Sequence, residues 1–131
     1  MKVLDANVVI AFLDERNALH AAARDALALA EDEDLLLHQV TLAEVLAGPA
    51  GLSDEFAAQV LNRVIAMQIE EITHAATPME VARLRARTGL PIPDCLVLLA
   101  AGRPDDGDTT ILTFDRRLAA KGRELGYRVE P

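Results

Sequence analysis

Short apolar runs alternate along this chain with longer segments in which apolar residues recur at helical spacing. The runs that we expect to form strands lie at 2–4, 35–37, 68–72, 110–113 and 127–129. The segments that we expect to form helices follow Asp5 directly and cover 17–30, 41–47, 53–67, 78–87, 93–101 and 115–125. Strands alternating with helices predict an α/β fold with a parallel sheet. No repeat or long linker divides residues 1–131, so we expect a single domain.

Composition narrows the function classes. Hydrophobic residues make up 51% of the chain but aromatic residues only 3%, which predicts an aliphatic core. The net charge of −8 argues against a protein that simply binds the phosphate backbone, although metal-binding carboxylates also make a nuclease acidic. A single cysteine excludes a disulfide framework and a cysteine-based zinc site. The first residues lack a signal-peptide pattern and no apolar run is long enough for a membrane helix, so we expect a cytoplasmic protein.

The charge is unevenly distributed. Residues 1–66 hold four basic and eleven acidic side chains, whereas residues 67–131 hold nine and ten. Arg83 and Arg87 are four residues apart on one predicted helix, with Glu80 three residues before Arg83. These arginines form either a solvated face with a weak ion pair or a contact with RNA phosphates or an acidic partner.

Four acids stand out by their positions. Asp5 and Asp115 each end a short apolar strand, just before a helix begins, whereas Glu44 and Asp94 lie near predicted helix starts. In open α/β sheets the functional site lies beyond the carboxyl ends of the strands, where Asp5 and Asp115 would meet.

Each of these acids also has a purely structural interpretation. Thr41 and Glu44 match a capping box, and Asp94 and Asp115 are good N-cap residues. Asp5 is harder to explain in this way, because a lone buried charge is costly. Four carboxylates at one edge would repel one another, and a hard divalent cation such as Mg²⁺ or Mn²⁺ would remove that conflict.

Other polar residues have simpler interpretations. His20, His38 and His74 lack metal-ligand spacing and are expected to be structural or exposed. Cys95 lies among apolar neighbours, which predicts a buried and inert thiol. Residues 105–108 lack the ligand spacing of a calcium loop and predict a turn.

The ordered set of acids resembles the PIN-domain ribonucleases, and within them the VapC-type toxins of toxin–antitoxin pairs. The matching segments are Leu4-Asp5-Ala6-Asn7, Thr41-Leu42-Ala43-Glu44-Val45, Pro91-Ile92-Pro93-Asp94-Cys95 and Thr113-Phe114-Asp115-Arg116-Arg117. Cys95, where this family usually has Ala, and Asn7, where it often has Ser, are mild departures.

The resemblance implies an α/β/α sandwich with a mostly parallel sheet of four or five strands, and Mg²⁺- or Mn²⁺-dependent cleavage of RNA. Asp5, Asp94 and Asp115 would hold the metal directly or through water, and Glu44 would be a further ligand or orient the attacking water. Asn7 and Thr113 would hydrogen-bond to these acids.

The resemblance also implies partners. These are a cellular RNA whose cleavage inhibits translation, a second copy of the chain in a homodimer, and a small antitoxin whose C-terminal segment covers the acidic site. Arg116, beside Asp115, is the residue that we expect to contact the substrate.

Two other function classes stay open. A non-catalytic binding or scaffold domain on the same fold would show no activity with any metal. A phosphotransfer or receiver-like domain would pair acids near the first strand and place a lysine late in the chain, where Lys121 lies inside a predicted helix.

Overall fold

A parallel sheet forms the middle layer of the molecule. In the computed structural model, which describes residues 1–73 and 76–131, the sheet has five strands in the order β3-β2-β1-β4-β5. The strands are β1 (Lys2–Leu4), β2 (Leu35–His38), β3 (Glu70–Ile72), β4 (Thr110–Leu112) and β5 (Arg128–Glu130). Every pairing between neighbours is parallel, so the predicted α/β fold with a parallel sheet is confirmed.

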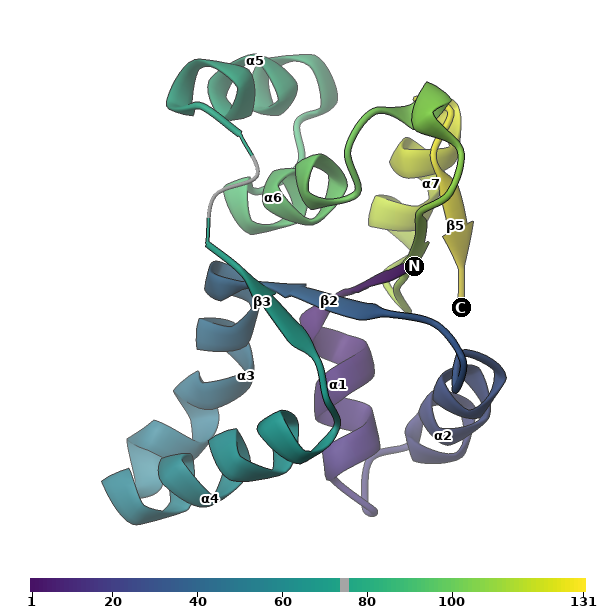
Figure 1. Cartoon of the computed structure of the whole chain (residues 1–131). Helices are drawn as coiled ribbons and strands as arrows, with labels where there is room; N and C mark the ends of the chain where they lie inside the picture. The colour runs from purple at the N-terminus through teal and green to yellow at the C-terminus, as the bar shows by residue number, and fades with distance from the viewer. Residues whose placement is uncertain (74–75) are drawn as a thin grey trace.

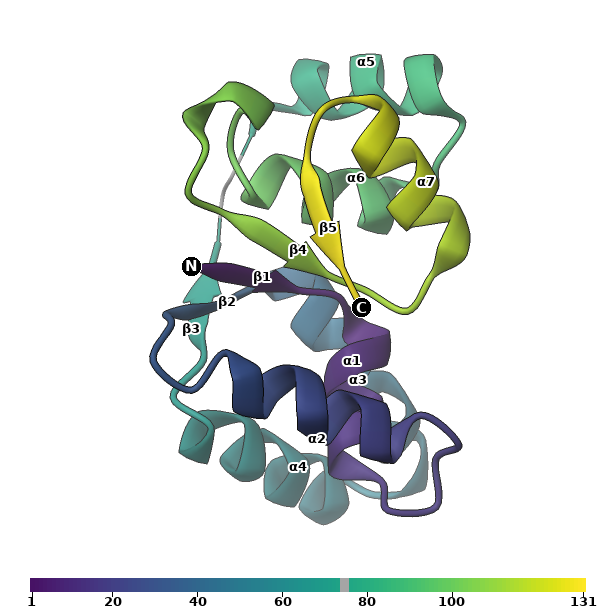
Figure 2. The same cartoon turned by 90° about the vertical axis from the view of Figure 1, so that its right-hand side faces the viewer.

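Helices cover both faces of the sheet, with α1 to α4 on one face and α5 to α7 on the other (Figures 1 and 2). They are α1 (Ala6–Leu13), α2 (His20–Leu29), α3 (Gln39–Leu52), α4 (Asp54–Ala66), α5 (Pro78–Thr88), α6 (Ile92–Ala100) and α7 (Arg116–Glu124), with a 3₁₀ turn at Pro104–Asp106. No helix in the described part of the chain is both long and apolar enough to cross a membrane.

Alternate strand residues build two aliphatic cores, one on each face of the sheet. Val3, Leu36 and Ile111 join the core beneath α5, α6 and α7. Their chain neighbours Leu4, Leu37 and Leu112 join the core beneath α1 to α4. Because both faces are covered, consecutive residues of the central strands are apolar, as in Val3-Leu4 and Ile111-Leu112, which is typical of parallel sheets.

The third helix differs from the prediction. We expected a short helix over 41–47 that stops at Gly48-Pro49, but α3 runs through Pro49 to Leu52. The fixed φ of proline is compatible with a helix, and packing of α3 against α4 offsets the hydrogen bond that Pro49 cannot donate.

The N-cap of α3 is His38, whose Nδ1 accepts a hydrogen bond from Val40 N at 3.1 Å. The capping box of Thr41 and Glu44 is therefore wrong, and the buried Thr41 hydroxyl has no partner in the described residues.

Two other helices begin at different residues than predicted. The helix α2 starts at His20 because the Asn17 side chain accepts a hydrogen bond from Leu19 N at 2.9 Å and forms a turn ahead of it. The helix α6 starts at Ile92 after Pro91, so that Asp94 lies inside its first turn and is not its N-cap.

Several local expectations are confirmed. Ser53 caps α4 and the left-handed Gly89 ends α5. Cys95 is fully buried, and burial raises the pKa of its thiol. The ring of His20 is hydrogen-bonded to the carbonyl of Ala11. The remaining histidine, His74, lies outside the described residues.

The packing of α7 on β5 makes Gly122 a sensitive position. A Cβ at Gly122 would lie 2.9 Å from Val129 Cγ2 and 3.4 Å from Leu98 Cδ2. We expect Gly122→Ala to lower the free energy of unfolding by about 1–3 kcal/mol, because overpacking shifts its neighbours. Urea unfolding measures this change.

The control is Gly51→Ala in α3, where a Cβ meets nothing within 4 Å. This variant should keep or raise the free energy of unfolding, by up to about 1 kcal/mol, because alanine favours a helix over glycine. Equal stability of Gly122→Ala and wild type would contradict the close contact between α7 and β5.

Candidate functional site

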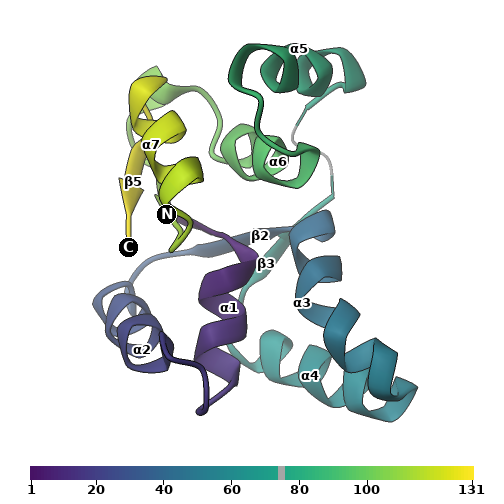
Figure 3. The ribbon, with the colours of Figure 1, turned by 180° about the vertical axis from the view of Figure 1, so that it is seen from behind.

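The four predicted acids lie toward one edge of the sheet. Asp5 directly follows β1, and Asp115 lies three residues after the end of β4, the neighbouring strand. In Figure 2, β1 and β4 run from left to right, and α1 and α7 begin beyond their right-hand ends. Glu44 lies in α3, which follows β2, and Asp94 lies in the first turn of α6. Figure 3 shows α1 and α3 side by side below the sheet and α6 above it.

The carboxylate of Asp5 is buried and firmly held, with 7% of the residue exposed. Its Oδ1 accepts a hydrogen bond from Ala6 N at 2.8 Å. Its Oδ2 accepts hydrogen bonds from the Thr113 hydroxyl at 2.6 Å and from Asn7 Nδ2 at 3.0 Å. Burial raises the pKa of Asp5 and the nearby Asp115 adds to this, while the hydrogen bonds oppose it.

Asn7 and Thr113 join the ends of β1 and β4. Asn7 donates to Asp5 and accepts a hydrogen bond from Phe114 N at 3.1 Å. Thr113 donates to Asp5, and its hydroxyl oxygen accepts from Asp115 N at 3.0 Å. The two side chains therefore fix the segments that carry Asp5 and Asp115 relative to each other.

Asp115 is the N-cap of α7 as predicted, but capping occupies only part of its carboxylate. Its Oδ1 accepts hydrogen bonds from Arg117 N at 2.8 Å and from Leu118 N at 3.0 Å. Within the described residues, Oδ2 has no hydrogen-bond partner. Asp115 can therefore cap α7 through Oδ1 while Oδ2 stays available to a ligand.

Electrostatic coupling links all four acids. Burial, together with the charges of Asp5, Asp115 and Glu44, raises the pKa of Asp94 to about 6, although Arg117 opposes the rise. Burial also raises the pKa of Glu44, together with the charge of Asp5. The other three carboxylates are therefore close enough to Asp94 to disfavour its ionisation.

This donor set suits a hard divalent cation. It consists of carboxylate oxygens, which Mg²⁺ and Mn²⁺ prefer, and a cation would relieve the repulsion that raises these pKa values. Within the described residues, no three His, Cys, Asp or Glu side chains form a ready-made metal-binding group. The acids thus have the ligand atoms and the negative charge that a divalent cation requires. Their positions in the described residues do not define a coordination geometry.

Two arginines outside the predicted site residues, Arg85 and Arg117, bond to one carbonyl, and Arg117 lies near Asp94. Arg117 acts on the pKa of Asp94 and donates to the carbonyl of Gly89 at 3.0 Å, and Arg85 donates to the same carbonyl. The only sequence signal was the pair of arginines after Asp115. Arg116 is exposed at the first position of α7, and its contact with substrate stays a prediction.

The fold is shared with solved structures of low sequence identity. The structure of VapBC2 from Rickettsia felis bound to a DNA fragment from their promoter matches with a TM-score of 0.69 and 15% identity, over 98% of this chain and 96% of that chain. FitAB bound to the IR36 DNA fragment matches with a TM-score of 0.63 and 22% identity, over 99% and 94%. PAE2754 from Pyrobaculum aerophilum matches with a TM-score of 0.63 and 19% identity, over 98% and 87%.

Sequence comparison assigns the family. No curated protein sequence matches the chain. The family model of the PIN domain, however, matches residues 2–124, which is nearly the whole chain. This chain therefore belongs to the PIN domain family.

Proposed function

We propose that this chain is a divalent-metal-dependent endoribonuclease, and that it is the toxin of a toxin–antitoxin pair. The observation that supports the nuclease most strongly is the convergence of four carboxylates, with the pKa of Asp94 raised to about 6. Membership of the PIN domain family, whose members are generally nucleases, supports the same reaction class. The shared fold with VapBC2 and FitAB supports the toxin assignment.

Three of the acids share one role in the proposed site and the fourth has another. Asp5, Asp94 and Asp115 would hold Mg²⁺ or Mn²⁺. Thr113 and Asn7 align Asp5, and capping of α7 engages only Oδ1 of Asp115. When bound, the cation supplies activation of water and stabilisation of charge on the phosphate. Glu44 would orient the attacking water or serve as a further ligand.

A groove beside Glu44 is the proposed binding site of the antitoxin. It is a cavity of about 610 Å³ between α1, α3 and α4. Ile10, Leu52 and Phe56 line it with exposed apolar side chains, and Glu44 lies among its lining residues. An antitoxin segment would place apolar side chains here and a basic side chain toward the four carboxylates. We further propose that the chain forms a homodimer.

The alternative is a non-catalytic binding domain on the same fold. In such a domain the acids would serve only as caps and surface charges. The absence of a capping role for Glu44 and Asp94 favours the nuclease, since neither residue caps the helix that carries it.

The acid variants test the nuclease. Asp5→Asn, Glu44→Gln and Asp94→Asn keep shape but remove the ligand charge, so each should lower the rate of Mg²⁺-dependent RNA cleavage by more than about 100-fold. This loss of activity is larger than the 10–100-fold loss that is typical when a residue that hydrogen-bonds to a metal ligand is mutated. The matched control Asp25→Asn, at an exposed position in α2, should cleave like wild type. Cleavage should stop in EDTA, and a wild-type rate in Asp5→Asn or Asp94→Asn would refute the site.

Melting curves without metal give a second readout of the same variants. Because the folded-state pKa of Asp94 is raised to about 6, the folded chain binds more protons than the unfolded chain between about pH 4 and pH 6. Stability of the wild type therefore falls as pH rises through this window. Asp94→Asn should melt higher than wild type at pH 7.5, and this gain should vanish near pH 4. A gain that does not depend on pH would contradict the assignment.

A matched pair of leucine variants tests the groove. Leu52→Ser, in the groove, should weaken inhibition by the proposed antitoxin by about tenfold, because truncating a residue at the centre of an interface can cost more than about 1 kcal/mol. Leu29→Ser, an even more exposed leucine on α2 outside the groove, should leave inhibition unchanged. Both variants should cleave RNA at the wild-type rate in the absence of inhibitor. Equal inhibition of Leu52→Ser and wild type would show that the antitoxin binds elsewhere.

A further inference from the structure

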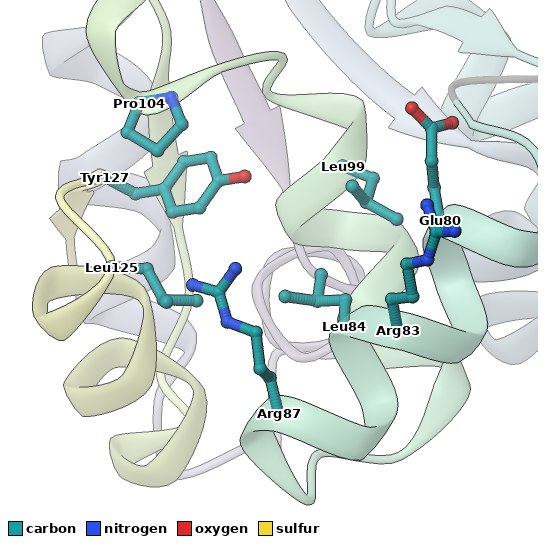
Figure 4. A pocket seen from close by; sticks show the side chains of 8 residues that line it. All are labelled: Glu80, Arg83, Leu84, Arg87, Leu99, Pro104, Leu125 and Tyr127. Carbon is teal, nitrogen blue, oxygen red and sulfur yellow. The ribbon is translucent and has the colours of Figure 1, made fainter.

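A second pocket lies on the other face of the sheet, between α5 and the end of α7 (Figure 4). Its volume is about 260 Å³, and its lining residues are Glu80, Arg83, Leu84, Arg87, Leu99, Pro104, Leu125 and Tyr127. The Tyr127 ring is half-buried, and its hydroxyl donates to the carbonyl of Gly102 at 3.2 Å, which fixes the ring in place. The pocket therefore offers one rigid aromatic ring beside aliphatic side chains.

The charged groups of the pocket favour an anion. In Figure 4 the Arg87 guanidinium points toward Leu125 and Tyr127, while the Glu80 carboxylate points away from them. Glu80 is engaged elsewhere, because its Oε2 accepts a hydrogen bond from Thr77 N at 2.7 Å in the capping box of α5. Within the described residues, no carboxylate forms an ion pair with Arg87. An unpaired guanidinium beside an apolar pocket is a site for a group that is both anionic and flat.

Two further arginines lie near the acidic edge, at the other end of α7 from the pocket. At the start of α7, Arg117 and Arg85 converge on the carbonyl of Gly89, and Arg117 is close enough to Asp94 to lower its pKa. The helical rise places Leu125 about 12 Å further along α7 from Arg117. A few nucleotides of extended strand cover such a distance. These arginines stand out in a chain whose net charge is −8.

We propose that the pocket between α5 and α7 is a subsite for one unpaired nucleotide of the RNA strand that reaches the acidic edge. Its base packs against the Tyr127 ring and the neighbouring leucines, and Arg87 contacts a backbone phosphate. Arg85 and Arg117 guide the strand between the two places. The proposal rests on the proposed ribonuclease function and adds a residue set that selects single-stranded substrate.

The size of the pocket supports this occupant over others. Ligand pockets for drug-sized molecules span roughly 300–1,000 Å³, so a volume of about 260 Å³ suits a single flat ring system. A protein helix would need a longer apolar groove than this pocket provides.

Tyr127 provides a direct probe, because it is the single tyrosine and the chain has no tryptophan. The full chain, in EDTA so that no cleavage occurs, is titrated with single-stranded oligouridylate while tyrosine fluorescence is recorded. We expect saturable quenching. Arg87→Gln should raise the apparent Kd by about tenfold, in the range found for single stacking or charged contacts. It should also reduce the slope of log K against log salt by about 0.7, since one phosphate contact is lost.

The matched control is Arg24→Gln, an exposed arginine of α2 on the other face of the sheet, which should bind like wild type. Absence of quenching when fluorescence anisotropy of a labelled oligonucleotide reports binding would overturn the subsite. Equal quenching by inorganic phosphate or by uridine monophosphate would also overturn it, in favour of a small-anion pocket. A change of oligomeric state in Arg87→Gln would overturn it in favour of an interface between copies.

Cleavage assays separate this proposal from the nuclease function. If Asp94→Asn abolishes metal-dependent cleavage while Arg87→Gln leaves both KM and quenching unchanged, the nuclease stands and the subsite is wrong. If the wild-type chain cleaves no RNA with Mg²⁺ or Mn²⁺ but Arg87-dependent quenching persists, the subsite stands and the catalytic function is wrong. Both are supported if Arg87→Gln raises KM and leaves kcat unchanged.

Discussion

The hydrogen bond from the Thr113 hydroxyl to Asp5, at 2.6 Å, is the contact on which the proposed site depends. It joins two loops that are more than one hundred residues apart in the chain, at the place where β1 and β4 end side by side. Asn7 supports it from the first turn of α1 by bonding to both Asp5 and Phe114. Without this network, Asp5 would be a buried carboxylate with a single backbone partner, which is costly to ionise.

Repulsion among the acids sets a balance between stability and function. Parallel strands β1 and β4 bring Asp5 and Asp115 to one edge, and α3 and α6 add Glu44 and Asp94. The raised pKa values of Asp5, Glu44 and Asp94 show that the fold tolerates ionisation of these groups at a cost. Residues at functional sites commonly oppose the stability of the fold in this way. A cation bound to the native state would turn the same charges into a stabilising contact.

Local sequence patterns were sufficient to predict the parallel sheet and the edge at which the acids lie. Short apolar strands that end in Asp5 and Asp115 predict the edge at which those residues meet, because parallel strands share a carboxyl end. The extent of α3 was not predictable from its sequence, since Gly48-Pro49 is a strong local stop signal that packing on α4 overrides. The capping box of Thr41 failed for a related reason, because His38 at the end of β2 caps α3 instead.

The contacts of the arginines could not be predicted from the sequence. Arg85 and Arg117 come from different helices and meet only at the carbonyl of Gly89, so their proximity depends on tertiary packing. Likewise, the fold makes Arg87 of α5 and Tyr127, which follows α7, parts of one pocket, although forty residues separate them. Spacing along the chain carries no signal for either arrangement.

The titration of Asp94 itself tests the central claim, that four carboxylates share one cation site, most directly. Carboxyl carbon NMR of the isotope-labelled chain would follow the ionisation of Asp94 without metal and then with Mg²⁺. We expect a metal-free pKa near 6. We also expect that pKa to decrease clearly on addition of Mg²⁺, because the cation favours the ionised form. A metal-free pKa near the ordinary value of about 4 that Mg²⁺ leaves unchanged would contradict it.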